Sequence, residues 1–328
     1  MAPSLLHPPS HLSPAAALQL SQQAPFVLQS SPATVSSAPL TALFSASETP
    51  DLWLKYENLL LSCLRTGDEH AAHQCLDRLV ARFGENNERV QALKGLVREA
   101  DATNNADLEK ILRDYDNILA ENGTNIPVTK RRIALLRSMG RVPEAITMLV
   151  RFLGFSPTDP EAWSELADLY LSQGMYSQAI FALEEVLVMA PNAWNMHARL
   201  GEVQYMAASA TGASDAESLK YLAEALKRFA RSVELCDDYL RGYYGLKLVT
   251  TKLINYPPKP AVVKATDVDD FTVPTTPTVE KLNELATEKL SEIVRRYTAK
   301  ERHWRGYDEA EIAAARELLA KDASQTEK

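Results

Sequence analysis

Four residues whose side chains bind zinc or act as nucleophiles lie within one short stretch of the chain. They are Cys63, His70, His73 and Cys75, and Cys and His are the usual ligands of structural zinc. The repeat pattern described below predicts that both cysteines lie on helix-packing faces and that His70 lies near a turn. The four side chains should therefore not converge, and we expect no metal site.

Adjacent carboxylates are the second candidate, because paired acidic groups perform general acid–base catalysis. Glu184–Glu185 and Asp237–Asp238 are neighbours in sequence, so on a helix they project in different directions and should form solvated faces. The chain has no phosphate-binding glycine loop, no H-E-x-x-H and no G-x-S-x-G. We expect no catalytic or cofactor-binding residue, and we predict that the protein is not an enzyme.

Composition indicates a helical protein with a real core. Hydrophobic residues make up 46% of the 328 residues and charged residues 24%, with only 12 glycines. Scarce Gly with abundant Ala, Leu and Glu favours helices. The net charge of −8 gives no broad cationic surface for nucleic acid or anionic lipid. No apolar run approaches the 18 residues of a membrane-spanning helix. No Lys or Arg precedes Lys55, whereas secretory and mitochondrial targeting signals need basic residues near the N-terminus. We therefore expect a soluble, cytosol-facing protein.

Proline distribution divides the chain. Residues 1–49 hold seven prolines and ten serines, which predicts a disordered N-terminal tail. Amphipathic helices of a repeat solenoid follow over 50–256, and a Pro-rich loop over 257–277. Helices over 278–321 should complete and cap the solenoid, with Trp304 and Tyr307 as part of the cap, before a frayed tail over 322–328.

The clearest repeat begins at Pro160. Trp163, Leu166, Ala167 and Tyr170 match the first helix of the tetratricopeptide (TPR) consensus, and Gly174 marks the turn. The second helix has a small residue, two large ones and a closing proline where the consensus requires them, namely Ala179, Leu183, Val186 and Pro191. The small residues let two antiparallel helices approach closely.

The pattern recurs at a period of about 34 residues. One period earlier it is repeated by Gly140, Ala145, Leu149, Phe152 and Pro157. One period later it restarts at Trp194, with its partner helix delayed by an insertion at 207–218. Further units begin near Trp53 and, less regularly, near Asn87, and the last is split across the Pro-rich loop. The sequence therefore predicts an all-α, right-handed superhelical TPR solenoid with extra C-terminal helices, rather than a non-repetitive helical bundle.

Consensus positions 2, 5, 9 and 12 of first helices line the groove of a TPR solenoid. In the Pro160 repeat these positions give a polar and acidic lining, made by Glu161, Ser164, Asp168 and Leu171. In the preceding repeat the lining is basic, with Lys130 and Arg137 at groove positions and Arg131 and Arg141 beside them. A groove that changes sign suits a polypeptide partner, although the same charges could also be ordinary solvated ones.

Several segments together resemble one TPR family. They are the stretch Asp159–Tyr170 with Leu183-Glu184-Glu185, the stretch Lys130–Ala134 with Pro143–Ile146, and Gly242–Leu246. All of them are similar to subunit 2 of the endoplasmic reticulum (ER) membrane protein complex, in a fungal-like form. The resemblance covers about residues 51–298. Residues 1–50 and the loop at 257–277 depart from it.

The resemblance implies a specific role. It implies a peripheral scaffold on the cytoplasmic face of the ER membrane, within a hetero-oligomer that inserts tail-anchored and multi-pass membrane proteins. Its partners would be the membrane-embedded and soluble subunits of that complex, and its membrane contact would be indirect. The alternative is a TPR adaptor of a chaperone or ubiquitin-ligase assembly. The chaperone carboxylate clamp is disfavoured, because Glu57 and Asn58 stand where it needs Lys and another polar residue.

Overall fold

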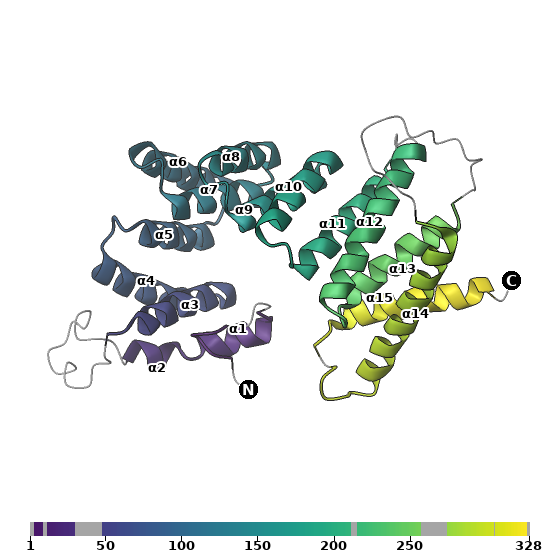
Figure 1. Cartoon of the computed structure of the whole chain (residues 1–328). Helices are drawn as coiled ribbons and strands as arrows, with labels where there is room; N and C mark the ends of the chain where they lie inside the picture. The colour runs from purple at the N-terminus through teal and green to yellow at the C-terminus, as the bar shows by residue number, and fades with distance from the viewer. Residues whose placement is uncertain are drawn as a thin grey trace. The chain divides into compact units, whose positions relative to one another are not determined.

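The computed structural model describes residues 3–8, 12–29, 48–210, 215–256, 274–304 and 306–326, and every regular element in these ranges is an α-helix (Figure 1). The prediction of an all-α fold is confirmed. The helices gather into two compact units, residues 1–148 and residues 149–328. The boundary between the units falls inside α8 (Val142–Phe155).

Unit 1 is built from helices that pack against the next helix, or the next but one, along the chain. Helix α3 packs against α1 and α4, and α7 packs against both α5 and α6. The bounds are α1 (Pro14–Ser21), α2 (Ala24–Gln29), α3 (Pro50–Thr66), α4 (Glu69–Phe83), α5 (Glu88–Asp101), α6 (Asn105–Glu121) and α7 (Ile126–Ser138).

The residues at the two ends of α3 and at the start of α4 show why these helices begin and end where they do. The Thr49 hydroxyl accepts a hydrogen bond from the Leu52 amide at 3.3 Å, and Pro50 occupies the first turn. The helix ends at Gly67, whose φ of 74° is left-handed and favours glycine. Asp68 then caps α4 by accepting from the Ala71 amide at 3.1 Å.

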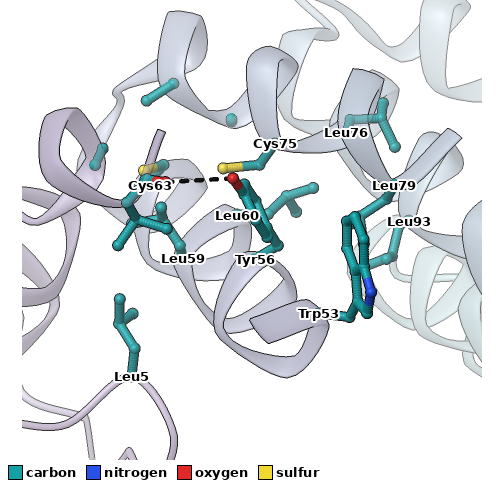
Figure 2. Packing of buried hydrophobic residues seen from close by; sticks show 14 of the residues in the cluster. Leu5, Trp53, Tyr56, Leu59, Leu60, Cys63, Cys75, Leu76, Leu79 and Leu93 are labelled. Atoms are coloured by element: carbon teal, nitrogen blue, oxygen red, sulfur yellow. Dashed lines mark hydrogen bonds between the residues drawn. The ribbon is translucent and has the colours of Figure 1, made fainter. Parts of the chain in front are cut away.

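A core cluster of unit 1 gathers around α3 and α4 and includes residues of the N-terminal segment and of α5 (Figure 2). Tyr56 of α3 lies beside Cys75 of α4, and Trp53 lies beside Leu79 of α4 and Leu93 of α5. The Tyr56 hydroxyl donates to the Val27 carbonyl at 3.2 Å, so a buried polar group ties the N-terminal helices to the first repeat.

The predicted disorder of residues 1–49 is wrong for the segment that forms α1 and α2. Ser13 caps α1 and Pro14 occupies its first turn, where proline costs nothing because the first amides have no partner within the helix. The buried apolar residues of α1 and α2 recur at helical spacing, namely Ala17, Leu20, Ala24 and Val27, and the last three join the core of α3 and α4. Residues 1–2, 9–11 and 30–47 of the predicted tail lie outside the described residues.

Unit 2 continues the pairing. Helix α9 packs against α10, α11 against α12, and α13 against α14. The bounds are α9 (Pro160–Ser172), α10 (Tyr176–Met189), α11 (Trp194–Ala207), α12 (Asp215–Leu235), α13 (Leu240–Ile254), α14 (Thr276–Thr298) and α15 (Glu309–Thr326). The last repeat is therefore a pair of α13 and α14, as the split-repeat interpretation predicts, with Ala286, Leu290 and Ile293 buried.

The C-terminal boundaries differ slightly from the predicted ones. Helix α15 runs to Thr326, past the predicted end of the C-terminal helices at residue 321. Residues 257–273 of the predicted loop and residues 211–214 of the predicted insertion lie outside the described residues. Trp304 stacks on Tyr307 with ring centroids 6.3 Å apart, and the Tyr307 hydroxyl donates to the Asp238 carbonyl at 2.7 Å. These contacts favour the cap interpretation of the aromatic pair.

Candidate functional site

The predicted basic lining lies in unit 1, on α7 and the turn after it. The Arg131 guanidinium binds Glu99 of α5, with Nε 3.1 Å from Oε1, and the Tyr115 hydroxyl donates to the same carboxylate at 2.5 Å. Burial alone would lower the pKa of Arg131, but the hydrogen bond to Glu99 and the charge of Glu99, together with the effect of Tyr115, outweigh burial and raise that pKa. Arg131 is therefore a cation that links two repeats, and its charge is compensated within the unit.

Arg141 is compensated in the same way. It binds Glu144 at 2.5 Å and Glu109 of α6 at 3.1 Å, and the bond to Glu144 is the main cause of its raised pKa. On α7 itself, Lys130 is half-buried and Arg137 is exposed. The four predicted basic residues thus lie on one segment of unit 1, but two of them serve contacts between repeats.

The predicted acidic lining lies in unit 2, on α9. Glu161 and Asp168 are exposed, whereas Ser164 and Leu171 are half-buried. Asp168 accepts a hydrogen bond from Arg199 of α11 at 2.8 Å, and Arg199 also binds Glu202 at 2.7 Å. The carboxylate at groove position 9 is therefore linked to the next repeat.

A cavity of about 460 Å³ lies where the groove continues between α11 and α13. On α11 it is lined at consensus positions 2, 5, 9 and 12 of the Trp194 repeat, by Asn195, Ala198, Glu202 and Tyr205. On α13 it is lined by Arg241, Tyr244 and Leu248. The N-terminal part of α15, which packs on α14 and α13 (Figure 1), closes one side with Glu311 and Ala314.

Sequence reasoning missed this part of the groove, although the signal was present. Adding one period to Glu161, Ser164, Asp168 and Leu171 reaches the four α11 positions. The insertion at 207–218 places the partner helix α12 later in the sequence than the period predicts, so the period alone does not give the groove positions of α13. The contribution of α15 depends on tertiary packing, which the repeat pattern does not encode.

Most of the residues predicted to pack the Pro160 repeat lie in its interior or at its turn. Leu166, Ala167, Ala179 and Leu183 are buried, and Gly174 has a left-handed φ of 70°. Trp163 and Tyr170 are half-buried and Pro191 is exposed. The Trp163 indole donates to the Pro157 carbonyl at 2.8 Å.

The preceding repeat is built in the same way. Ala145 and Leu149 are buried, and Gly140 has a φ of 73°. Pro157 is exposed and supplies the carbonyl that binds Trp163. The positions of this repeat therefore match those of the Pro160 repeat one period later.

Among the residues considered for chemistry, Cys63 and Cys75 lie in the same buried cluster (Figure 2). No group of three or more His, Cys, Asp or Glu side chains in the part of the chain that is described is arranged to hold a metal ion. His73 binds Asp101 at 3.2 Å. Burial raises the pKa of both Cys63 and Cys75 to about 12, which keeps them as thiols at neutral pH and makes them poor nucleophiles.

These features define the class of the protein. Antiparallel helix pairs at a period of about 34 residues, with small residues at the close approaches and a left-handed glycine between the helices, are those of a TPR solenoid. No helix in the described ranges has both the length and the apolar character needed to span a bilayer.

Comparison with known proteins shows which TPR family it is. The EMC2 TPR-like repeat domain matches residues 75–221. The TPR repeat protein oca3 of Schizosaccharomyces pombe is 31% identical over 261 residues, covering 76% of this chain and 88% of that protein. ER membrane protein complex subunit 2 of Xenopus tropicalis is 31% identical over 218 residues, covering 66% of this chain and 69% of that protein. The corresponding subunit of Saccharomyces cerevisiae is 26% identical over 181 residues, covering 52% of this chain and 60% of that protein.

This chain belongs to the ER membrane protein complex subunit 2 family. The resemblance inferred from its repeats is confirmed, and so is the TPR fold class.

Proposed function

We propose that this chain is a non-catalytic scaffold subunit of the ER membrane protein complex. It acts at the cytoplasmic face of the ER membrane as a peripheral subunit and holds the cytosolic parts of membrane-embedded subunits together with soluble ones. In this way it supports the insertion of tail-anchored and multi-pass membrane proteins. The observation that carries the proposal is family membership: relatives named as subunit 2 of that complex align over two thirds of this chain.

The geometry of unit 2 supports a scaffold role. Consecutive first helices present a groove, and its cavity is lined by tyrosine, arginine and leucine side chains. Tyr and Arg are enriched among the residues that contribute most to protein–protein binding. A polypeptide partner therefore suits this surface better than a small-molecule substrate does.

The state of the reactive side chains supports a non-catalytic role. The two most buried cysteines have raised pKa values, and the partly buried Arg131 is committed to an ion pair with Glu99. A catalytic group would instead be poised near the operating pH and turned toward a substrate.

Affinity purification from membranes tests the proposal. The full chain, tagged at one end, is purified in mild detergent, and the proteins that follow it are quantified by mass spectrometry. We expect several multi-pass ER proteins in stoichiometric amounts. Recovery of soluble chaperones or ubiquitin-ligase subunits alone would leave the TPR fold intact and overturn the function.

A further inference from the structure

The cavity between α11, α13 and α15 combines an apolar floor with a polar rim. Ala198, Phe229, Leu240 and Leu248 supply apolar surface, and Gly245 leaves room for the Phe229 ring. Three tyrosines surround this floor, namely Tyr205, Tyr239 and Tyr244. An apolar pocket ringed by tyrosine and arginine has the composition of an interface hot spot.

The two arginines that line the cavity are already paired with carboxylates. Arg199 binds Asp168 and Glu202, and Arg241 binds Glu311 of α15 at 2.5 Å. Lys252 keeps its positive charge, since it contacts only the Tyr205 ring, 5.0 Å from its ammonium, and the neutral Ser209 hydroxyl, but it does not line the cavity. Neither lining arginine is left to attract an acidic partner, so charge complementarity favours an uncharged segment.

The three tyrosine hydroxyls remain available to a partner. Burial raises the pKa of Tyr205 and of Tyr239, so both phenols stay protonated at neutral pH and act as donors. Within the described part of the chain, none of the three hydroxyls donates to a protein acceptor. By contrast, the hydroxyl of Tyr243, next to Tyr244 on α13, donates to Asp237 at 3.1 Å. Backbone carbonyls of an incoming chain are suitable acceptors.

We infer that this cavity anchors an uncharged polypeptide segment, which inserts one large aliphatic or aromatic side chain between Tyr205 and Tyr244 and accepts hydrogen bonds from the tyrosines on its backbone carbonyls. The inference rests on the proposed function and names which stretch of the groove carries most of the binding energy. Helix α15 supplies one wall of the anchor, so the C-terminal helix is part of the binding site.

Two variants of the full chain test the anchor in the affinity purification described above. Tyr205→Ala with Tyr244→Ala removes the aromatic walls, and Tyr205→Phe with Tyr244→Phe removes only the hydroxyls. The matched control is Tyr176→Ala with Tyr221→Ala, which truncates two half-buried tyrosines that do not line the cavity. Melting curves of the isolated chains establish that each variant folds.

We expect the alanine pair to lower retention of at least one partner by about 30-fold or more, the effect of losing a hot-spot residue. The phenylalanine pair should lower it by several-fold, and the control by less than twofold. Equal retention by all three variants would overturn the anchor while leaving the scaffold role standing. If the unaltered chain recovers no membrane partner, the scaffold role itself fails, and the anchor fails with it.

A photo-crosslinking residue at Leu248 gives a second readout that does not depend on the stability of the tyrosine variants. In the intact complex, p-benzoylphenylalanine at this position should crosslink to an uncharged segment of another polypeptide. The same probe at Ser291, an exposed residue of α14, should not. Crosslinks confined to this chain or to a second copy of it would contradict the inference.

Discussion

Phe229 of α12 sets how closely three helices of unit 2 approach. A Cβ atom built at Gly245 of α13 would lie 2.0 Å from the Phe229 ring, and one built at Gly201 of α11 would lie 3.1 Å from it. Both glycines lie inside helices, where glycine is normally destabilising by about 1 kcal/mol. The ring therefore requires hydrogen at Gly245 and leaves little room for a side chain at Gly201, and at Gly245 the benefit of close packing outweighs the helix propensity that is lost.

Gly245→Ala should therefore destabilise the protein. The added methyl group must displace a buried ring, and overpacking of this kind costs about 1–3 kcal/mol, more than the gain in helix propensity. Gly154→Ala is the matched control, since nothing lies within 4 Å of a Cβ there, and it should be neutral or stabilising by up to about 1 kcal/mol. Thermal denaturation followed by circular dichroism compares the two; equal melting temperatures would contradict the packing argument.

The buried cysteines lead to a second residue-scale prediction. Cys63 and Cys75 are fully buried, whereas Cys236 is half-buried. We expect a thiol reagent at pH 8 to modify Cys236 in the folded chain and the other two only after unfolding. Rapid modification of three thiols without denaturant would contradict the burial of Cys63 and Cys75.

The same thiols should make stability depend on alkaline pH. Burial raises the pKa of Cys63 and Cys75 to about 12, whereas an unfolded thiol has a pKa of about 8.5. Between these values the unfolded chain has released protons that the folded chain retains, so the free energy of unfolding falls as pH rises. Each thiol contributes at most about 1.4 kcal/mol per pH unit. Denaturant unfolding from pH 8 to pH 10 should show a shallower decline in a Cys63→Ala, Cys75→Ala variant.

At the scale of elements, α1 and α2 act as a helical cap on the first repeat. Their buried side chains cover α3, and the Asn58 side-chain amide donates to the Leu5 carbonyl at 2.8 Å. Without this cover, the apolar face of α3 would be open to water, which is the usual problem of a terminal repeat.

Leu20→Ala should show the importance of this cap. Leu20 is completely buried, and truncating such a leucine costs about 2–5 kcal/mol. Leu18→Ala is the control, because Leu18 of the same helix is 50% exposed and its loss should cost less than about 0.5 kcal/mol. Chemical denaturation of both variants checks the difference. A Leu20 variant as stable as the Leu18 variant would mean that α1 does not cap the core.

The elements also show what the sequence could and could not predict. The repeat register follows from local rules. A small residue at Ala167 and a left-handed turn at Gly174 mark one repeat, and the same residue types recur about 34 residues away. Proline density predicts no helix near the N-terminus, but Pro14 and Pro25 lie in the first turns of α1 and α2, where proline is tolerated. The pairing of groove arginines with particular carboxylates depends on tertiary contacts, which no periodicity specifies.

At the scale of the whole molecule, ion pairs recur at the spacing of the repeats. Arg89 binds Glu57, Arg131 binds Glu99 and Arg141 binds Glu109, each 32 residues apart, and Arg199 binds Asp168 at a separation of 31. A carboxylate in one repeat thus meets an arginine one period later, within each unit. These pairs reduce the charge that the predicted basic and acidic linings offer to a partner, so apolar and tyrosine contacts gain importance in binding.

A scaffold that binds its partners in the folded state must be stabilised by them, because ligand binding to the native state raises the free energy of unfolding. We expect the melting temperature of the chain to be higher in the purified complex than alone, with a difference that grows with partner concentration. At a hundred times the dissociation constant the gain is about 2.7 kcal/mol. Differential scanning fluorimetry of the isolated chain, with and without its purified partners, measures this difference.

The tyrosine variants then separate folding from binding. Tyr205 and Tyr244 are only half-buried, so the Tyr205→Phe, Tyr244→Phe chain should melt alone at nearly the temperature of the unaltered chain. The rise in its melting temperature when partners are added should be smaller than for the unaltered chain, because the lost hydroxyls weaken the complex without removing core packing. If the variant loses stability alone but keeps the full gain from partners, the two tyrosines belong to the fold of unit 2, and the energy that holds the complex together must come from another part of the groove.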